Sequence, residues 1–266
     1  QSHSDCMMIV PVDNTRGKIK LISLMRDSLV DIDGYGEDKL NAAYFRGGPS
    51  LAIRTINENF GTDIKDYVAV DFEQLVQIVD AIGGVDYDVP FRMQYSDPSQ
   101  HLEIDLQPGM QHLTGKQTVE FLRWRHNNDY SKQYVNGDEG RVENQQKFLK
   151  ELARQVLQVK NASKIPKIAE AVSKNVKTDF TTGELLWMGK QALQIDNANL
   201  KFYTLPGYGA MSYAGSDPYK YSFFFPKEKE TLELVNKYFN PYEEPITKLD
   251  MVTGPAGSSS SGYSGG

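Results

Sequence analysis

The strongest constraint on the fold is a segment in which two short apolar runs enclose one helical pattern. Residues 67–70 are strand-like, and Asp71 followed three residues later by Gln74 is a capping-box pattern that opens a helix. Gly83 and Gly84 end this helix, and residues 85–89 form a second strand-like run. Strands that alternate with helices in this way predict an α/β layered domain.

The same signals recur along the rest of the chain. Residues 6–12 and 18–24 predict a strand hairpin with a turn at 14–17. Residues 39–45 predict a short helix ended by Gly47 and Gly48, and Pro49 suits the first turn of a second helix that runs to residue 60. Further helices are predicted after Thr114, over 138–159, after Thr181 and over 226–239, with strands at 102–106, 200–205 and 221–225. Polar loops are expected at 92–100 and 126–137. We therefore expect one domain over residues 1–240, followed by a flexible Ser/Gly-rich tail over 241–266.

Composition limits the classes of ligand. The chain has 266 residues, a formal net charge of −6 and a pI near 5.3. Nucleic-acid binding needs a broad basic surface, so we expect no nucleic-acid partner, and any anion site must be a local cluster of cations. Cys6 is the single cysteine, which excludes an intramolecular disulfide and predicts a small core residue.

No run of residues is apolar and long enough to span a membrane. The chain starts at Gln1 and leads directly into a strand-like run, from which we expect that an N-terminal signal or anchor precedes it.

Several common catalytic motifs are absent from the sequence. There is no Gly-x-Ser-x-Gly elbow, no His-Glu-x-x-His pair and no Cys/His metal set. Residues 109–116 resemble a phosphate-binding loop, but five residues separate the two glycines and Gln117 stands where Ser or Thr is required. Nucleophile-elbow, zinc and nucleotide-loop chemistry are therefore not predicted.

The remaining polar pattern consists of cations and carboxylates at the ends of elements. Arg26 and Asp27 follow a predicted strand, where α/β sheets commonly bind ligands. If residues 121–125 are extended, Arg123 and Arg125 point to the same face. Arg141 opens the long helix and shares one face of it with Gln145, a position suited to phosphate. Each feature alone is more often a solvated surface charge, but together they indicate an anion site.

These segments, in this order, resemble the LytR-CpsA-Psr family of bacterial cell-envelope enzymes, over residues 4–239. The matching pieces are Ser4-Asp5, Ser23-Leu24-Met25-Arg26-Asp27-Ser28, Lys39-Leu40-Asn41-x-Ala43-Tyr44-x-x-Gly47-Gly48, Val79-Asp80-Ala81-Ile82-Gly83-Gly84-Val85, Leu113-x-Gly115, Arg123-x-Arg125, and Gly137-Asp138-x-Gly140-Arg141 followed by Gln145-Gln146. The chain departs from the usual family pattern at His3 and Asn144, where the family often has Arg.

The resemblance implies an α-β-α sandwich with a central mixed β-sheet flanked by helices, anchored at the outer face of the cytoplasmic membrane in the bacterial cell envelope. It implies a phosphotransferase that moves a glycopolymer, such as a teichoic acid or capsule, from a polyprenyl (undecaprenyl) pyrophosphate carrier onto peptidoglycan or another surface acceptor. The product is a phosphodiester, and the implied cofactor is Mg²⁺ or Mn²⁺.

The resemblance also assigns the site residues. The catalytic residues are Asp5, Arg26 and Asp27, with Asp5 as the metal ligand, and the pyrophosphate-binding residues are Arg26, Lys39, Arg123, Arg125, Arg141 and Gln145. Two alternatives stay open on the same residues. One is a non-catalytic module that binds a polyprenyl phosphate or has a regulatory role. The other is a hydrolase that releases the glycan phosphate to water.

Overall fold

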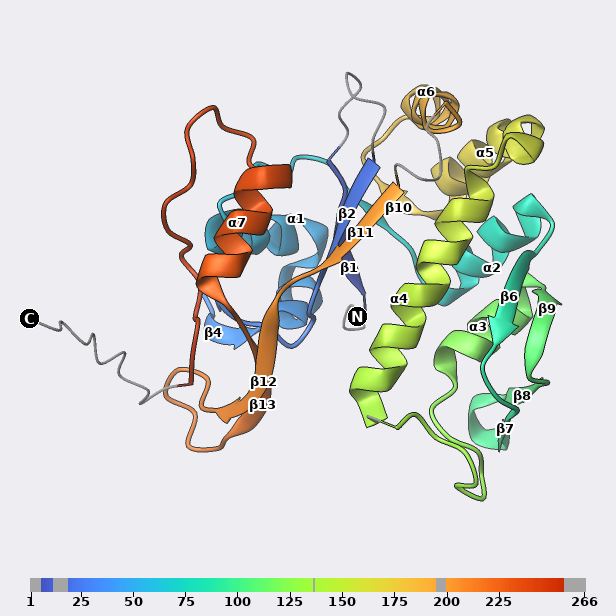
Figure 1. The fold of residues 1–266 in the computed structure, drawn as a ribbon, viewed down its shortest axis with the longest axis horizontal. Helices are drawn as coiled ribbons and strands as arrows, with labels where there is room; N and C mark the ends of the chain where they lie inside the picture. Colours follow the sequence, from blue (N-terminus) through green and yellow to red (C-terminus); the bar gives the residue numbers. More distant parts are fainter. Residues whose placement is uncertain (1–5, 12–18, 136, 195–199, 256–266) are drawn as a thin grey trace, which may run out of the picture. The chain divides into compact units, whose positions relative to one another are not determined.

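A computed structural model describes residues 6–11, 19–135, 137–194 and 200–255 (Figure 1). The described residues divide into two compact units. The first contains residues 6–11, 20–65 and 202–255, and the second contains residues 19, 66–135, 137–194 and 200–201. Each unit has its own hydrophobic core, and the two are described separately.

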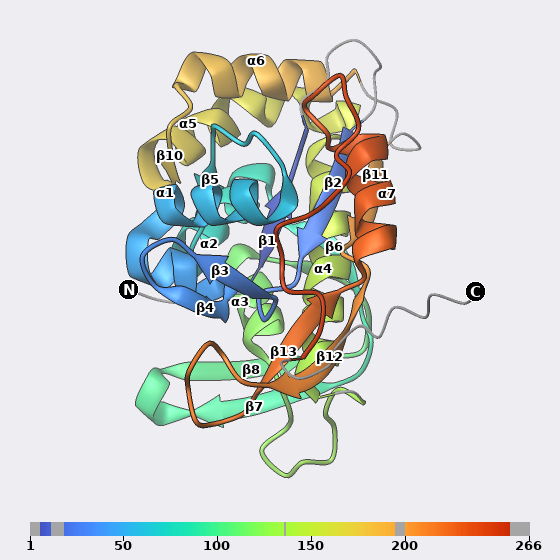
Figure 2. The same ribbon diagram turned by 90° about the vertical axis from the view of Figure 1, so that its left-hand side faces the viewer.

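Helices and short sheets form the first unit. β1 (Met7–Ile9) pairs antiparallel with β2 (Ile19–Leu24), as the predicted hairpin requires, and β11 (Leu200–Thr204) completes a sheet in the order β1-β2-β11. β3 (Leu29–Ile32) pairs with β4 (Gly36–Lys39), and β12 (Gly207–Ser212) pairs with β13 (Tyr221–Pro226). α1 (Leu40–Phe60) and α7 (Glu228–Tyr238) supply the helices, visible in blue and red in Figure 2.

The break predicted between the two helical segments at Gly47 and Gly48 is confirmed, as a kink inside α1. Gly48 in α1 has φ +64° and ψ −158°, a conformation that residues with a Cβ essentially never adopt. Pro49 follows and cannot donate to the preceding turn, so the helix restarts there. Gly61 ends α1 in the left-handed region at φ +64°, as a C-terminal glycine cap does.

The second unit begins with the strand–helix–strand segment identified from the sequence. β5 (Val68–Ala69) precedes α2 (Phe72–Ile82), and both reciprocal bonds of the Asp71–Gln74 capping box are formed. β6 (Val85–Val89) pairs with β9 (Gly109–Leu113), β7 (Met93–Asp97) with β8 (Leu102–Leu106), and β5 with β10 (Lys177–Thr178). The remaining elements are η1 (Pro98–Gln100), α3 (Gly115–Arg123), α4 (Gly137–Val156), η2 (Val159–Lys164), α5 (Ile165–Asn175) and α6 (Thr182–Ala192).

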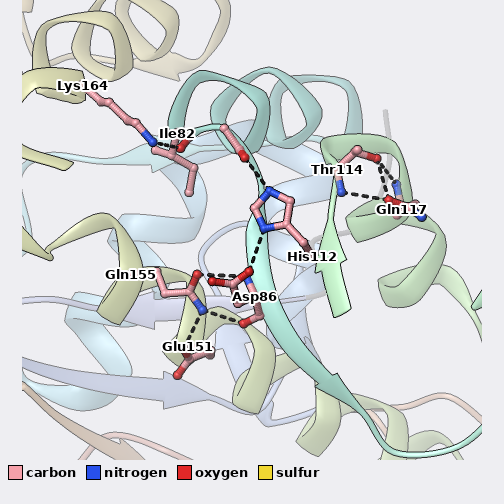
Figure 3. Close-up of polar contacts among 9 residues, drawn as sticks. Ile82, Asp86, His112, Thr114, Gln117, Glu151, Gln155 and Lys164 are labelled. Atoms are coloured by element: carbon pink, nitrogen blue, oxygen red, sulfur yellow. Dashed lines mark hydrogen bonds and ion pairs between the residues drawn. The ribbon is translucent and has the colours of Figure 1, made fainter. Parts of the chain in front are cut away.

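A network of polar contacts connects α2, β6, β9 and α4 in the second unit (Figure 3). The His112 Nδ1 atom lies 2.7 Å from an Asp86 carboxylate oxygen, and its Nε2 lies 2.7 Å from the carbonyl oxygen of Gly83. The Gln155 side chain accepts from the Asp86 backbone N–H at 2.9 Å and donates to the Asp86 carbonyl at 2.6 Å. Lys164 donates to the Ile82 carbonyl. These bonds fix the Gly83–Gly84 turn against the β6–β9 pair.

Two sequence predictions about backbone conformation are wrong. Residues 92–100 are not a loop, because residues 93–97 form β7, whose Met93 is buried opposite Leu106. Residues 121–125 are not extended, because α3 continues to Arg123 while Phe121 and Leu122 are buried in the core. Trp124 then adopts φ −62° and ψ 137° and ends the helix.

The described part of the C-terminal segment, residues 241–255, has neither helix nor strand, but it packs against the rest of the first unit. Leu249 is 2% exposed, and Ile246 packs against the core. The Asn236 side chain in α7 donates to the Ile246 carbonyl and accepts from its N–H, both at 2.7 Å. Residues 256–266 lie outside the described residues.

The described residues have a mixed α/β fold, as the sequence predicts. None of the helices that they form is both long and apolar enough to cross a bilayer.

Candidate functional site

Arg26, Asp27 and Lys39 form a charged cluster in the first unit. One Asp27 carboxylate oxygen lies 2.7 Å from the Lys39 Nζ, and the other lies 3.5 Å from the Arg26 Nε. The side chains of Arg26, Asp27 and Lys39 are 19%, 35% and 32% exposed, so solvent and ligands can reach all three. The cluster carries two positive charges and one negative charge, and it therefore favours an anionic ligand.

The backbone around this cluster is held by three different elements. Ser28 N–H and Oγ both donate to the Met25 carbonyl, closing a tight turn after β2. The first amides of α1 donate to this turn, Leu40 N–H to the Ser28 carbonyl and Asn41 N–H to the Arg26 carbonyl. From β13, Phe224 N–H donates to the Asp27 carbonyl at 2.8 Å. The turn is thus rigidly placed at the N-terminal end of α1.

These contacts decide how the cluster can bind. Because the amides of Leu40 and Asn41 are already used by the turn, an anion there could contact the side chains of Arg26 and Lys39 but not these amides. The Asp27 carboxylate contacts both cations, and these contacts restrict the positions of the two side chains. Lys39 also lies 5.8 Å from the centroid of the Phe223 ring, which limits the positions of its ammonium group.

The other predicted anion-binding residues belong to the second unit. Arg141 lies near the start of α4 and is 5% exposed, and Gln145 on the next turn donates its side-chain amide to the Leu122 carbonyl at 2.8 Å. This bond ties α4 to the last turn of α3. The helix start and the shared helix face predicted for Arg141 and Gln145 are present.

Arg123 and Arg125 do not have the arrangement inferred for an extended segment. Arg123 is the last residue of α3, and its guanidinium donates to the Gln100 side-chain carbonyl at 2.9 Å. Arg125 lies beyond the helix end and is exposed. The same-face argument for this pair is therefore wrong, because Phe121 and Leu122 are buried most effectively as part of a helix.

The contact between Tyr134 and Asn144, near Arg141 in the second unit, was not predicted from the sequence. Tyr134 is 8% exposed, and its hydroxyl accepts from the Asn144 side-chain amide at 2.7 Å. Burial raises the pKa of Tyr134, against the opposing effects of the Asn144 hydrogen bond and the Arg141 charge. The polar composition of residues 126–137 concealed this buried tyrosine. An aromatic residue within this polar segment could have indicated burial, and Tyr134 indeed contacts Phe91 and Trp124.

The carboxylates of the described residues do not form a metal site by themselves. No group of three or more His, Cys, Asp or Glu side chains in the described ranges is arranged to hold a metal ion. Asp5, the predicted metal ligand, lies outside the described residues, and Asp27 is directed to Arg26 and Lys39. Mg²⁺ commonly takes only one or two protein carboxylates together with substrate phosphates, so the prediction of a divalent cation depends on Asp5 and the ligand.

The model of the LytR_cpsA_psr family matches residues 1–238, and the chain belongs to that family.

Individual relatives are similar over most of the chain. "Polyisoprenyl-teichoic acid--peptidoglycan teichoic acid transferase TagV" of Bacillus subtilis is 31% identical over 241 residues, which are 89% of this chain and 59% of TagV. "Regulatory protein MsrR" of Staphylococcus aureus is 31% identical over 206 residues, covering 77% of this chain and 60% of MsrR. The crystal structure of B. subtilis TagV superposes with a TM-score of 0.72 at 28% identity, over 89% of this chain and 88% of that one.

The chain spans about three-fifths of the length of these curated relatives. Similarity therefore defines the family and the fold, while the activity and partners of the whole protein are matters for proposal.

Proposed function

We propose that this chain is the catalytic domain of a transferase in cell wall biogenesis. In this proposal it moves a glycopolymer from a polyprenyl pyrophosphate carrier onto peptidoglycan or another cell-surface acceptor. The protein acts at the outer face of the cytoplasmic membrane, to which it is anchored. The observation that carries the proposal is the Arg26–Asp27–Lys39 cluster, fixed at the start of α1 in a chain of this family.

The chemistry follows from the charge of the substrate. The acceptor hydroxyl oxygen forms a bond to the phosphorus next to the glycan, and the bond from that phosphorus to the bridging oxygen breaks. Polyprenyl phosphate leaves with the bridging oxygen, and the hydroxyl proton passes to a carboxylate, for which we propose Asp5. Arg26 and Lys39 neutralise charge on the phosphate oxygens, and Asp27 holds the two cations in place.

The remaining predicted residues belong to the same proposal. Arg123, Arg125, Arg141 and Gln145 are proposed to contribute to pyrophosphate binding. Mg²⁺ or Mn²⁺ is proposed as the cofactor, held by Asp5 and substrate phosphate oxygens, and it would supply further charge neutralisation when bound.

A regulatory or lipid-binding module is the second candidate, because MsrR, one of the similar proteins, is named as a regulatory protein. A lipid-pyrophosphate hydrolase uses the same cations with water in place of the acceptor. The outcome of the reaction distinguishes the three candidates. A transferase gives an acceptor-linked phosphodiester, and a hydrolase gives free glycan phosphate even when acceptor is present. A binding or regulatory module binds the lipid without turnover.

The test is a transfer assay with polyprenyl pyrophosphate-linked glycan and a peptidoglycan acceptor, comparing the parent with Lys39→Met and Lys65→Met. Lys65 belongs to the same unit but is 74% exposed and pairs only at the surface with Asp63. A hydrogen bond to a charged group contributes about 1.5–3 kcal/mol, so Lys39→Met should lower kcat/KM about 10- to 100-fold. Lys65→Met should retain parental activity. Equal activity of both variants would contradict the role of the cluster.

A further inference from the structure

A cavity of about 670 Å³ lies in the first unit between the β3–β4 hairpin and the segment that connects β12 to β13. Figure 2 shows this orange connection passing beside the blue hairpin, and the Gly215 N–H donates to the Glu37 carboxylate at 3.0 Å across the two. The cavity is widely open to solvent, and its volume falls within the range of roughly 300–1,000 Å³ found for small-ligand sites.

Aromatic rings line much of this cavity. Tyr35 comes from the hairpin, and Tyr219 and Tyr221 come from the connecting segment and the start of β13. The three side chains are 52%, 69% and 42% exposed, so large ring surfaces stay in contact with solvent. Arg46 lies over one side of the Tyr35 ring, 4.9 Å from its centroid, and helps to fix its orientation.

Two carboxylates stand beside these rings and keep the wall in place. Asp217 accepts from the Tyr219 N–H at 2.9 Å and from the Tyr221 hydroxyl at 3.2 Å, while Glu37 accepts from Gly215. Partial desolvation and the adjacent Asp217 carboxylate raise the pKa of Tyr221, so its hydroxyl keeps its proton at neutral pH. A carboxylate has about four acceptor positions, and each of these two has some left for a ligand hydroxyl.

This combination of groups selects a neutral ligand rich in hydroxyls. The negative face of an aromatic ring attracts the weakly positive C–H face of a sugar ring, and carboxylates accept hydrogen bonds from sugar hydroxyls. None of the described residues that line the cavity is Lys or Arg, and two are acidic, which disfavours a phosphate group there. The cavity therefore differs in charge from the Arg26–Asp27–Lys39 cluster.

The cavity and that cluster are connected through one face of two strands. Glu37 and Lys39 are two residues apart in β4, and Tyr221 and Phe223 are two residues apart in β13. Each pair therefore points to one side of its strand. Lys39 contacts the Phe223 ring, and the centroids of Phe223 and Tyr221 are 6.4 Å apart. The buried Phe223 ring thus lies between Lys39 and Tyr221 and contacts both side chains.

We propose that this cavity is a saccharide subsite that binds a neutral sugar ring of the transferred glycan or of the glycan acceptor. Its place in the reaction rests on the transferase proposal, but sugar binding itself does not. The rings and carboxylates recognise the hydroxyl-bearing ring, and the adjacent cluster recognises the phosphate.

The binding test uses a neutral probe, tetra-N-acetylchitotetraose, followed by saturation-transfer NMR and titration of tyrosine fluorescence. The variants are Tyr219→Ala and the matched control Tyr242→Ala, a tyrosine of the same unit that is 57% exposed and does not line the cavity. We expect Tyr219→Ala to bind about three- to tenfold more weakly, as the loss of one aromatic stacking partner predicts, and Tyr242→Ala to bind like the parent. No binding by the parent, or equal weakening in both variants, would overturn the subsite.

Kinetics of the same two variants assign the source of the sugar. A rise in KM for the acceptor alone in Tyr219→Ala assigns the subsite to the acceptor glycan, and a rise for the lipid-linked donor alone assigns it to the transferred glycan. If the parent binds the saccharide but shows no transfer activity, and Tyr219→Ala loses this binding, the transferase proposal is rejected and the subsite is kept. Transfer with no saccharide binding would do the reverse.

Discussion

Gly115 provides a sharp test of the packing in the second unit. It is the first residue of α3 and is buried against α2. A Cβ atom added there would lie 2.3 Å from the Val76 carbonyl oxygen and 2.8 Å from the Val76 Cα, distances that backbone atoms cannot tolerate. The Gly115 N–H also donates to the Asp80 carboxylate at 2.8 Å, so any shift of α3 weakens this bond.

The expected effect of Gly115→Ala combines these two consequences. Overpacking that forces backbone shifts costs about 1–3 kcal/mol, and weakening a hydrogen bond to a charged group adds up to roughly 1.5–3 kcal/mol. We expect a loss of about 2–4 kcal/mol in the free energy of unfolding. For a chain of this size, 1 kcal/mol corresponds to about 2–4 °C, so Tm should fall by roughly 5–15 °C.

The assay is thermal and urea unfolding followed by circular dichroism, with Gly183→Ala as the control. Gly183 also lies in the first turn of a capped helix, but its added Cβ would meet only the Thr181 Oγ1, at 3.9 Å. Without a clash, Gly→Ala restricts the unfolded chain and stabilises by about 0.4–1 kcal/mol. If Gly115→Ala unfolds at or above the temperature of Gly183→Ala, the close approach of α2 and α3 is wrong.

Two further predictions concern the contacts in Figure 3. The Asp86 carboxylate first, and the Gly83 carbonyl second, raise the pKa of His112, so its contribution to stability is complete below the unfolded pKa of about 6.5 and disappears as pH rises through the higher folded pKa. The positive Lys164 partly opposes this shift. Urea unfolding should therefore show His112→Gln less stable than the parent at pH 6, with a smaller difference at pH 9. Because the ring is more than half exposed, the difference at pH 6 should be under about 1 kcal/mol. A larger difference at pH 9 would contradict the raised pKa of His112. Gln155→Leu removes both partners of the Asp86 backbone, and we expect a loss of about 2 kcal/mol or more at either pH; parental stability would show that these bonds contribute nothing.

The helix starts were predictable because their signals are local. In each capping box an N-cap side chain and a side chain three residues later bond to each other's backbone N–H groups. The boxes that begin at Asp71, Thr114 and Thr181 all form both bonds. Glycine positions were equally informative, since Gly48 and Gly61 adopt left-handed φ values that the sequence could only satisfy with glycine.

Elements without such signals were missed. The N-cap of α5 is Lys164, which makes no side-chain capping bond, and Pro166 in the first turn was not recognised as a start signal. β7 and β9 have exposed residues along one face, and their burial depends on partners more distant in the chain. Strand propensity is decided largely by such pairing, which composition does not show.

The candidate site was predictable in part for the same reason. Arg26 and Asp27 could be assigned from the end of a strand, but the contact between Asp27 and Lys39 joins residues that are distant in sequence. Only the family resemblance suggested Lys39. The same-face arrangement of Arg123 and Arg125 depended on an extended segment, and it was wrong because α3 continues to Arg123 with Phe121 and Leu122 buried. The assignment of both arginines to pyrophosphate binding stays a prediction.

The contacts around the cluster affect how variants of the family motifs should be interpreted. Asn41 belongs to the same motif as Lys39, yet its backbone N–H donates to the Arg26 carbonyl, and the amide of Leu40 donates to Ser28. A change that disturbs the start of α1 therefore displaces Arg26 and Asp27 even if the changed residue never contacts the substrate. Loss of activity alone does not identify a ligand-binding residue here. Lys39→Met is more informative, because it removes the charge and keeps the backbone at the helix start.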